Sequence, residues 1–425
     1  MRCGAGLARP LIVRLAFLLV ALVASYSLFS FWHLAADQAK LPHVISSAIG
    51  HPPNTAANPP NTTAAVTPPG AAATPSQTGN AAQVHNPGLG PRNSTLGFDV
   101  ILALSKGGQT WRVQGLQAAG ALTGVQVTIP PQPSWSKEMV EAFAALGPEG
   151  VQKPGVGSAT AWLAHIDLLK YVIQGNFNSA LIVEDDVDWD VNIKDQLSRA
   201  AETVRKHTKA SFEEGNPYSS LWDVLWLGHC GDIPRDNETF TFFSDPTVIR
   251  HSQYEGFAAG YVGDHFPEGQ RAVYRSQGAI CSYAYAVNKQ GIRKVLEYVS
   301  QGQEQAFDTK LFHGCRSGSL NCISVNPELF RHFQPDKKFG QTSEVDKQNW
   351  GGEEKIQHDT NNDKGSPHVS GTSGQPQFDV AKKIVGTTNN IRESARCKAL
   401  WNKKCIGKQG SFTDMIKNMD IFGRR

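Results

Sequence analysis

A short apolar run that ends in a cluster of carboxylates is the segment of this chain best suited to chemistry. Residues 181–183 read Leu-Ile-Val, which is typical of a strand buried on both faces of a parallel sheet. The acidic side chains that follow are Glu184, Asp185, Asp186, Asp188 and Asp190. Ligands of α/β proteins bind at the carboxyl ends of such strands, where crowded carboxylates repel one another unless a cation neutralises them. Their oxygens suit Mg²⁺ or Mn²⁺, which in turn holds a diphosphate, so the segment predicts a metal-dependent nucleotide site.

A calcium-binding loop is a second interpretation of these acids, because Asp186, Asp188 and Asp190 alternate as in an EF-hand. That template requires Gly at its sixth position and Glu at its twelfth, where this chain has Val191 and Leu197. The calcium loop is therefore rejected. A solvated charge run at a helix start or on the surface is the third interpretation, and it stays open beside the metal site.

The elements expected around the cluster alternate between strand and helix. A strand over residues 98–104, a loop, a helix over 111–121 and a strand over 125–129 begin an α/β domain with a mostly parallel central sheet. The loop at 105–108 is neither Gly-x-Gly-x-x-Gly nor a Walker A sequence. Further along, we expect a helix capped by Ser158, strands over 222–227 and 280–287, and a helix over 290–299.

The N-terminus predicts a membrane anchor. Residues 15–36 contain no charged residue, and that length spans the hydrocarbon core of a bilayer. Arg2, Arg9 and Arg14 precede the run and Asp37 follows it, so the amino end is expected to stay cytoplasmic. The alternative is a cleaved signal peptide, since Val-Ala-Ser at 23–25 offers small residues for cleavage. The favoured topology is a single-pass type II protein of the Golgi or endoplasmic reticulum membrane with a lumenal domain.

The composition divides the chain further. We expect a cytoplasmic tail over residues 1–14, the anchor over 15–36 and a stem rich in Pro, Thr and Ala over 37–96. The catalytic domain is expected over 97–336, followed by a polar loop and a Cys-containing segment over 337–425. The formal net charge is only +3 and no basic run is interleaved with aromatics, so nucleic acid is not an expected partner.

The cysteines fit an oxidising compartment. Six of the seven follow the anchor, an even number that permits three disulfides among fifteen possible connectivities. Cys315 with Cys322 and Cys397 with Cys405 are the simplest local pairs. No Cys-x-x-Cys occurs, which argues against a structural zinc site.

The order of these motifs resembles glycosyltransferase family 25, the family of lipooligosaccharide and procollagen galactosyltransferases. The matching pieces are Trp111-Arg112, Gly157-Ser158 with His165, the strand ending in Glu184-Asp185-Asp186, residues 281–296, Phe307-Asp308 and residues 325–330. The resemblance covers roughly residues 98–334 and implies a GT-A-like fold with a nucleotide-sugar donor, UDP-galactose foremost, bound through Mn²⁺. Two departures affect donor and acceptor identity: the loop sequence Ser105-Lys-Gly-Gly-Gln, and an insertion over residues 232–275.

Residue roles follow from the resemblance and from the chemistry of sugar transfer. A divalent cation stabilises the charge left on the nucleoside diphosphate, with Asp186 the leading ligand and Asp188 in reserve. Glu184 and Asp185 are expected to hold ribose, metal-bound water or the sugar, and Arg112 and Ser105 to contact the donor. His165 is either a hydrogen-bonded core histidine or a donor-site group. An inverting transfer also needs a base, for which Asp308 is the leading candidate and Asp232 the competitor; that Asp308 is a surface residue capping the helix over 309–312 stays open as an equal alternative.

The expected activity is therefore a metal-dependent hexosyltransferase that acts on a glycan or glycoprotein acceptor in the secretory pathway. Two alternatives remain open. A metal-dependent phosphoester hydrolase would need His and Asp clusters at several strand ends, of which His229 with Asp232 is the one hint. A lumenal binding protein would keep the fold and bind nucleotide sugar or glycan without turnover.

Overall fold

The computed structural model describes residues 90–211, 214–339, 342–346 and 378–405. The predicted tail, anchor and nearly all of the predicted stem lie outside these ranges. Across the ranges that are described, no helix is long and apolar enough to span a membrane.

Seven strands form the central sheet, in the order β1-β2-β7-β4-β8-β6-β5. In chain order they are β1 (Val100–Leu104), β2 (Ser179–Glu184), β4 (Val224–Gly228), β5 (Thr241–Ser244), β6 (Gln270–Arg275), β7 (Ala284–Asn288) and β8 (Cys322–Asn326). Five strands point the same way, but β7 and β6 are antiparallel to their neighbours. The α/β class is confirmed, and the mostly parallel sheet is found as a mixed one, in which β7 and β6 interrupt the five strands that share a direction.

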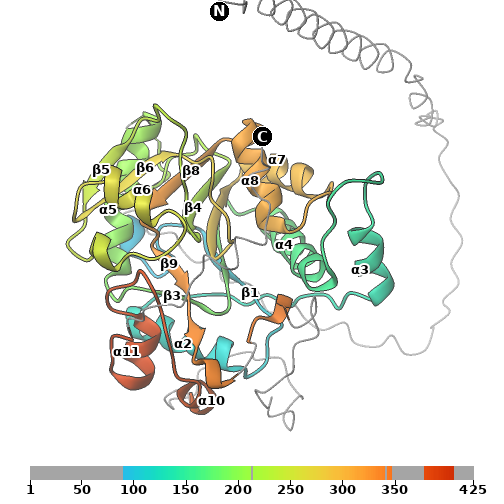
Figure 1. Ribbon diagram of the computed structural model, residues 1–425, viewed down its shortest axis with the longest axis horizontal. Helices are drawn as coiled ribbons and strands as arrows, with labels where there is room; N and C mark the ends of the chain where they lie inside the picture. Colours follow the sequence, from blue (N-terminus) through green and yellow to red (C-terminus); the bar gives the residue numbers. More distant parts are fainter. Residues whose placement is uncertain (1–89, 212–213, 340–341, 347–377, 406–425) are drawn as a thin grey trace, which may run out of the picture. The chain divides into compact units, whose positions relative to one another are not determined.

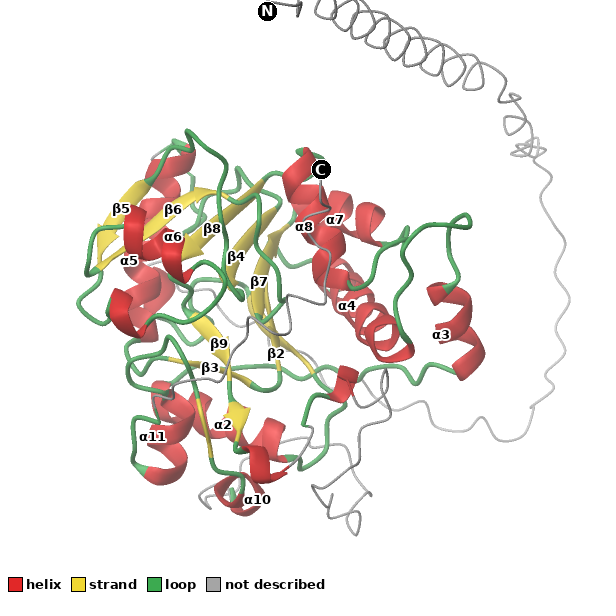
Figure 2. Ribbon diagram, in the orientation of Figure 1, coloured by secondary structure: helices red, strands yellow, loops and turns green. Residues whose placement is uncertain are grey.

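Helices cover both faces of this sheet (Figure 2). They are α2 (Trp111–Thr123), α3 (Lys137–Ala144), α4 (Val156–Gln174), α5 (Ile193–Thr208), α6 (Ala259–His265), α7 (Gly291–Val299), α8 (Phe307–Ser317), α10 (Asp379–Lys383) and α11 (Ala395–Trp401). The described residues also contain three single-turn 3₁₀ helices, which are η1 (Gly90–Arg92), η2 (His251–Gln253) and η3 (Lys337–Phe339). Side chains along β2 point alternately to the two faces of the sheet. Leu181 and Val183 pack in the core beneath α5, while Ala180 and Ile182 pack in the core beneath α4, α7 and α8.

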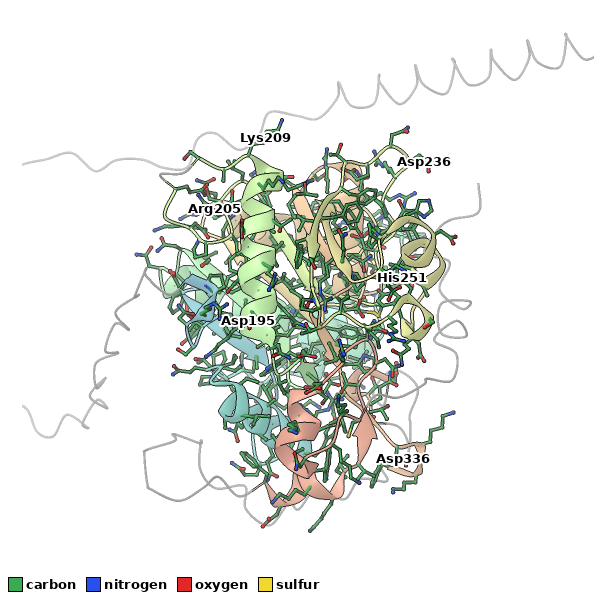
Figure 3. The ribbon with its side chains drawn as sticks, turned by 90° about the vertical axis from the view of Figure 1, so that its left-hand side faces the viewer. Asp195, Arg205, Lys209, Asp236, His251 and Asp336 are labelled. Atoms are coloured by element: carbon green, nitrogen blue, oxygen red, sulfur yellow. A yellow bond between two sulfur atoms is a disulfide. The ribbon has the colours of Figure 1, made fainter. Side chains whose placement is uncertain are left out.

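Helix α5 has charges placed to suit its dipole, as Figure 3 shows along its length. Asp195 lies in the first turn, and Arg205, Lys206 and His207 lie in the last. Lys209 ends the helix in the left-handed conformation, with φ 55°. These charges stabilise the helix, whose buried residues pack with Leu181 and Val183 of β2.

Two smaller sheets lie next to the end of β2. Strand β3 (Val187–Trp189) pairs with β9 (Phe330–His332), and β10 (Gln334–Pro335) pairs with β11 (Gly386–Thr387), both antiparallel. The C-terminal helices α10 and α11 pack against α2, so segments from opposite ends of the described chain lie side by side (Figure 1). The predicted C-terminal segment over 337–425 is thus in part an integral layer of the domain.

Several expected elements have different bounds in the structure. Helix α4 begins at Val156 after Gly155, so Ser158 lies inside the helix and the prediction that it caps the helix was wrong. The strand expected over 125–129 is reduced to one parallel bridge between Thr128 and Leu102. The strand expected over 280–287 starts only at Ala284, because the residues before it form a loop bonded to Cys230 and Glu184.

Two disulfides are present in the described chain. Cys315–Cys322 was predicted, whereas Cys230–Cys281 joins residues 51 positions apart and was not. The other proposed pair, Cys397 and Cys405, is not a disulfide; the two thiols lie in hydrogen-bond contact. Their short separation in the sequence favoured pairing, and the fold brings the two thiols together without the bond.

The packing of α11 on α2 depends on a glycine. A Cβ atom at Gly115 in α2 would overlap the guanidinium of buried Arg396 in α11. We predict that Gly115→Ala lowers the free energy of unfolding by about 1–3 kcal/mol, measured by denaturant titration. Gly263→Ala in α6, where the same Cβ meets open space, is the matched control and should be neutral or stabilising by up to about 1 kcal/mol. Equal effects of the two variants would contradict the packing.

Candidate functional site

The acidic cluster occupies a turn between two sheets. Strand β2 ends at Glu184, Asp185 and Asp186 form a two-residue turn, and β3 begins at Val187. The turn is fixed at its far side, where the Asp186 carbonyl accepts a hydrogen bond of 2.8 Å from the Phe333 amide. The carboxylates are therefore at the carboxyl end of a buried strand, as predicted.

The register of β1 against β2 brings the first loop to this turn. Leu104 pairs with Glu184 in parallel, so the residues that follow each strand emerge side by side. Ser105 Oγ donates to Asp185 Oδ2 at 2.7 Å. The next helix, α2, then begins at Trp111 and presents Arg112 to the same acids.

Arg112 is the counter-charge of the turn. Its Nη1 contacts Asp185 Oδ1 at 3.1 Å and Asp186 Oδ2 at 2.6 Å. Burial opposes the charged form, but the charges of Asp186 and Asp185 raise the pKa of Arg112 above its ordinary value. Burial raises the pKa of Asp185, and the Arg112 charge opposes that shift. Predicted donor-site residues Ser105, Arg112, Asp185 and Asp186 thus form one contact set.

Glu184 faces away from Arg112 into a buried hydrogen-bond chain. Ser282 Oγ donates to Glu184 Oε1 at 3.1 Å and lies 3.3 Å from His165 Nε2, while Tyr285 Oη lies 3.1 Å from His165 Nδ1. Burial lowers the pKa of His165 to about 3, so the imidazole is neutral. Burial, with the charge of Asp186, raises the pKa of Glu184 to about 8. His165 is a core histidine stacked on Phe307, and it reaches the site only through Ser282.

Asp308 lies beside this group at the start of α8. Its carboxylate accepts hydrogen bonds of 2.8 Å from the Cys281 and Thr309 amides. Burial raises the pKa of Asp308, and its charge in turn contributes to the raised pKa of Glu184. The side chain is partly exposed and lies in the first turn of α8, where it bonds both the helix start and the loop before β7. The fold therefore brings Asp308 to the acidic turn.

Asp188, predicted as the reserve metal ligand, has other contacts. The carboxylate is fully buried. Its oxygens accept hydrogen bonds from the Thr388 and Ser394 hydroxyls and from the Arg396 and Trp189 amides. Asp188 therefore anchors the C-terminal segment and has no oxygen open to a ligand. Asp190 is likewise bonded to Asn192 and Glu393.

Asp232 is also outside the contact set. It is fully buried between Ser276, which donates to it at 2.8 Å, and neighbouring His229. Burial raises the pKa of Asp232, and the hydrogen bond from Ser276 opposes that shift. The sequence placed both residues after a strand, but their strand, β4, is separated from β2 by β7. The structure favours Asp308 over Asp232 as the acid nearest the turn.

Two residues near the acidic turn, His332 and Arg396, were not predicted from the sequence. His332 on β9 pairs with Val187 across the small sheet, near enough for the charge of Asp186 to affect it, although burial lowers the pKa of His332 to about 4. Arg396 donates to the backbone carbonyls of Asp185 and Arg112 at 3.0 and 3.1 Å. Only the pairing of β3 with β9 and the packing of α11 on α2 bring them here, and neither follows from local patterns.

The coordinating atoms at the turn fit a hard cation whose remaining coordination positions are filled by a bound substrate. Asp186 Oδ1 and His332 Nδ1 are buried and make no hydrogen bond within the described residues. No group of three or more His, Cys, Asp and Glu side chains is arranged to hold a metal ion in the described part of the chain. Mg²⁺-like ions are commonly held by one or two carboxylates together with substrate phosphates, a set that Asp186 and Asp185 can supply.

A separate hollow lies elsewhere on the surface. Its lining contains none of the site residues and consists of Val248, Ile249, Arg250, Gln253, Arg392 and Lys404. Arg392 and Lys404 are already bonded to the Pro246 carbonyl and Glu393. The contacts of the acidic turn therefore define the candidate site, and this hollow does not.

Comparisons with known proteins add no family. No protein-family model and no curated protein matches the chain. Among solved structures, the one titled "Crystal Structure of A197 from STIV" matches with 9% identity and a TM-score of 0.26. That match covers 58% of this chain and 89% of the other. A likeness of this size carries no argument about fold or function.

The raised pKa of Glu184 predicts a pH dependence of stability. The folded protein holds a proton on Glu184 up to about pH 8, while the unfolded chain releases it near pH 4.3. The contribution of Glu184 to the free energy of unfolding should therefore be fully present below about pH 4.3. It should be lost as pH rises toward 8, which lowers the free energy of unfolding by roughly 2–4 kcal/mol. We expect Glu184→Gln to flatten the fall, measured as unfolding free energy in chelator between pH 5 and 9. Exposed Glu202→Gln on α5 should behave as wild type; identical curves for all three proteins would refute the assignment.

Proposed function

We propose that this protein is a metal-dependent glycosyltransferase that moves a hexose, foremost galactose from UDP-galactose, onto a glycan or glycoprotein acceptor. The observation that carries the proposal is the convergence of Asp185, Asp186, Arg112 and Ser105 at the end of β2, with a buried Asp186 oxygen left unbonded. Such a set suits a divalent cation and a diphosphate.

The architecture supports a GT-A-like assignment. An acidic turn links a strand of a mixed α/β sheet directly to a small second sheet, formed by β3 and β9. The resemblance to family 25 places its acidic motif at this same turn. The predicted anchor and stem would give a type II Golgi or endoplasmic reticulum protein, in keeping with the disulfides Cys230–Cys281 and Cys315–Cys322.

The donor would lie across the turn. Asp186, with Asp185 and His332 beside it, would hold Mn²⁺ or Mg²⁺, which when bound stabilises negative charge on the leaving diphosphate. Arg112 supplies a fixed positive charge to the same group. Ser105 keeps the Asp185 carboxylate oriented, and Arg396 holds the backbone of the turn through the Asp185 carbonyl.

Asp308 is the proposed general base. In an inverting transfer, the acceptor oxygen attacks the anomeric carbon while the bond from that carbon to the diphosphate breaks and its electron pair leaves with the phosphate. The acceptor proton passes to a carboxylate. Burial raises the pKa of Asp308 and makes it a better proton acceptor, while the Cys281 and Thr309 amides fix its position.

The alternatives have less support. A phosphoester hydrolase needs His and Asp side chains that are open to substrate at several strand ends. His229 and Asp232 are both fully buried and bonded inside the protein. A lumenal binding protein would show donor affinity without sugar transfer, which a product assay separates from the proposed enzyme.

Removing the proposed ligand tests the metal site. We predict that Asp186→Ala lowers Mn²⁺-dependent transfer from UDP-galactose by at least about 100-fold, because metal stabilisation of the leaving group contributes several kcal/mol. Release of UDP and formation of product are measured together, with folding checked by circular dichroism. Asp195→Asn, at an exposed position on α5, is the matched control and should keep full activity. Unchanged metal-dependent turnover in Asp186→Ala would sink the assignment.

Removing the proposed base tests the chemistry separately. Asp308→Asn should lower kcat by about 100- to 10,000-fold with little change in donor KM, because only proton acceptance is lost. Asp232→Asn is the comparison and should affect stability more than kcat, since the residue is enclosed. If Asp232→Asn folded and lost turnover while Asp308→Asn did not, Asp232 would be the base.

A further inference from the structure

A short segment from far along the chain lies over the first loop and Arg112. Residues 342–346 contribute the Thr342 carbonyl, which accepts a hydrogen bond of 2.8 Å from Arg112 Nη2. They also contribute Glu344, whose Oε2 pairs with Lys106 Nζ at 2.9 Å. One peptide therefore contacts two of the cations near the acidic turn, Lys106 and Arg112.

Lys106 is placed by the same register that positions Ser105. It follows Ser105 directly, so its backbone lies next to the residue that bonds Asp185. Gly107 and Gly108 follow in the left-handed region, with φ 78° and 74°, and the space where their Cβ atoms would lie is open. The loop thus offers an exposed ammonium group and free volume beside the carboxylate turn.

Glu344 supplies negative charge where a phosphate would be expected. Its charge also helps to raise the pKa of Arg112, so it acts on both cations. Asp185 and Asp186 already occupy Arg112 Nη1, which leaves Lys106 and the Nη2 side of Arg112 to face residues 342–346.

We infer that Lys106 and Arg112 form a binding site for the diphosphate group of a nucleotide ligand, and that Glu344 is an internal anion competing for it. The inference rests on the proposed function for the identity of the nucleotide. The anion site itself rests only on the contacts of Lys106, Arg112 and Glu344.

The existing pair is weak enough to exchange. The Lys106 side chain is 64% exposed and that of Glu344 is 33% exposed. Ion pairs of such exposure contribute little, because water and salt screen them. A diphosphate carries more charge than one carboxylate and presents several acceptor oxygens, so it should displace Glu344 from Lys106.

The test measures binding of UDP with MnCl₂, and of inorganic pyrophosphate alone, to the full-length chain by calorimetry. Glu344→Gln should bind both probes about two- to fivefold more tightly than wild type, since a surface competitor is removed. Lys106→Gln should bind both more weakly, and the Glu344→Gln effect should become smaller in the Lys106→Gln background, where the Glu344 charge acts on Arg112 alone. Glu141→Gln is the control, because Glu141 forms a similar exposed pair with Lys137 on α3.

Each outcome decides a separate question. UDP binding that is equal or weaker in Glu344→Gln overturns the competitor role while leaving the proposed function intact. Pyrophosphate binding strengthened by Glu344→Gln, without any UDP binding, supports the anion site and overturns the nucleotide-sugar function. Absence of binding of both probes to every variant overturns both.

Discussion

The balance of charge at the end of β2 is the constraint on which the rest of the site depends. Three consecutive carboxylates lie in a largely buried turn, and one guanidinium, Arg112, contacts two of them. A buried charge without a partner would cost several kcal/mol, so the turn could not keep this form without its cation. The third acid, Glu184, meets the same constraint differently, because its raised pKa leaves it protonated at neutral pH and bonded to Ser282. Paired and protonated carboxylates thus lie side by side, and this difference separates the side of the turn at Arg112 from the side at Ser282.

Local patterns were sufficient to predict the parts of the fold that are defined within one segment. The run at 181–183 predicted β2 because apolar residues continue on both faces, and the ends of α2 and α7 were predicted to within a few residues. Local patterns were not sufficient to predict features that tertiary contacts determine. The prediction of a strand at 125–129 was wrong because only Thr128 pairs with β1. The mixed direction of the sheet arises because β7 lies between β2 and β4, two strands that precede it in the sequence. The roles of Asp188, His332 and Arg396 follow from pairings across the small sheet and α11, which spacing along the chain does not encode.

The site is also the place where segments that are far apart in the sequence contact one another. The loop after β1, the turn after β2, the loop before β7 and the start of α8 each supply one polar contact to the others. Cys230–Cys281 holds the loop before β7, whose Cys281 amide bonds Asp308. Each of these groups lies within three residues of a strand end or in the first turn of a helix, which restricts its position. Residues 232–275 contain β5, α6 and β6, and these two strands lie at the far edge of the sheet from β2 and the acidic turn.

The four hydrogen bonds on Asp188 have a consequence for how the protein is made. Three of their donors, at Thr388, Ser394 and Arg396, are about 200 positions later in the chain. A nascent chain that has already built β2 therefore exposes a carboxylate whose partners have not yet been synthesised. Domains generally fold as units as the ribosome extends them from the N-terminus. The contacts of Asp188, next to the acidic turn, can be completed only near the end of translation, so this region matures only when almost the entire polypeptide has been made.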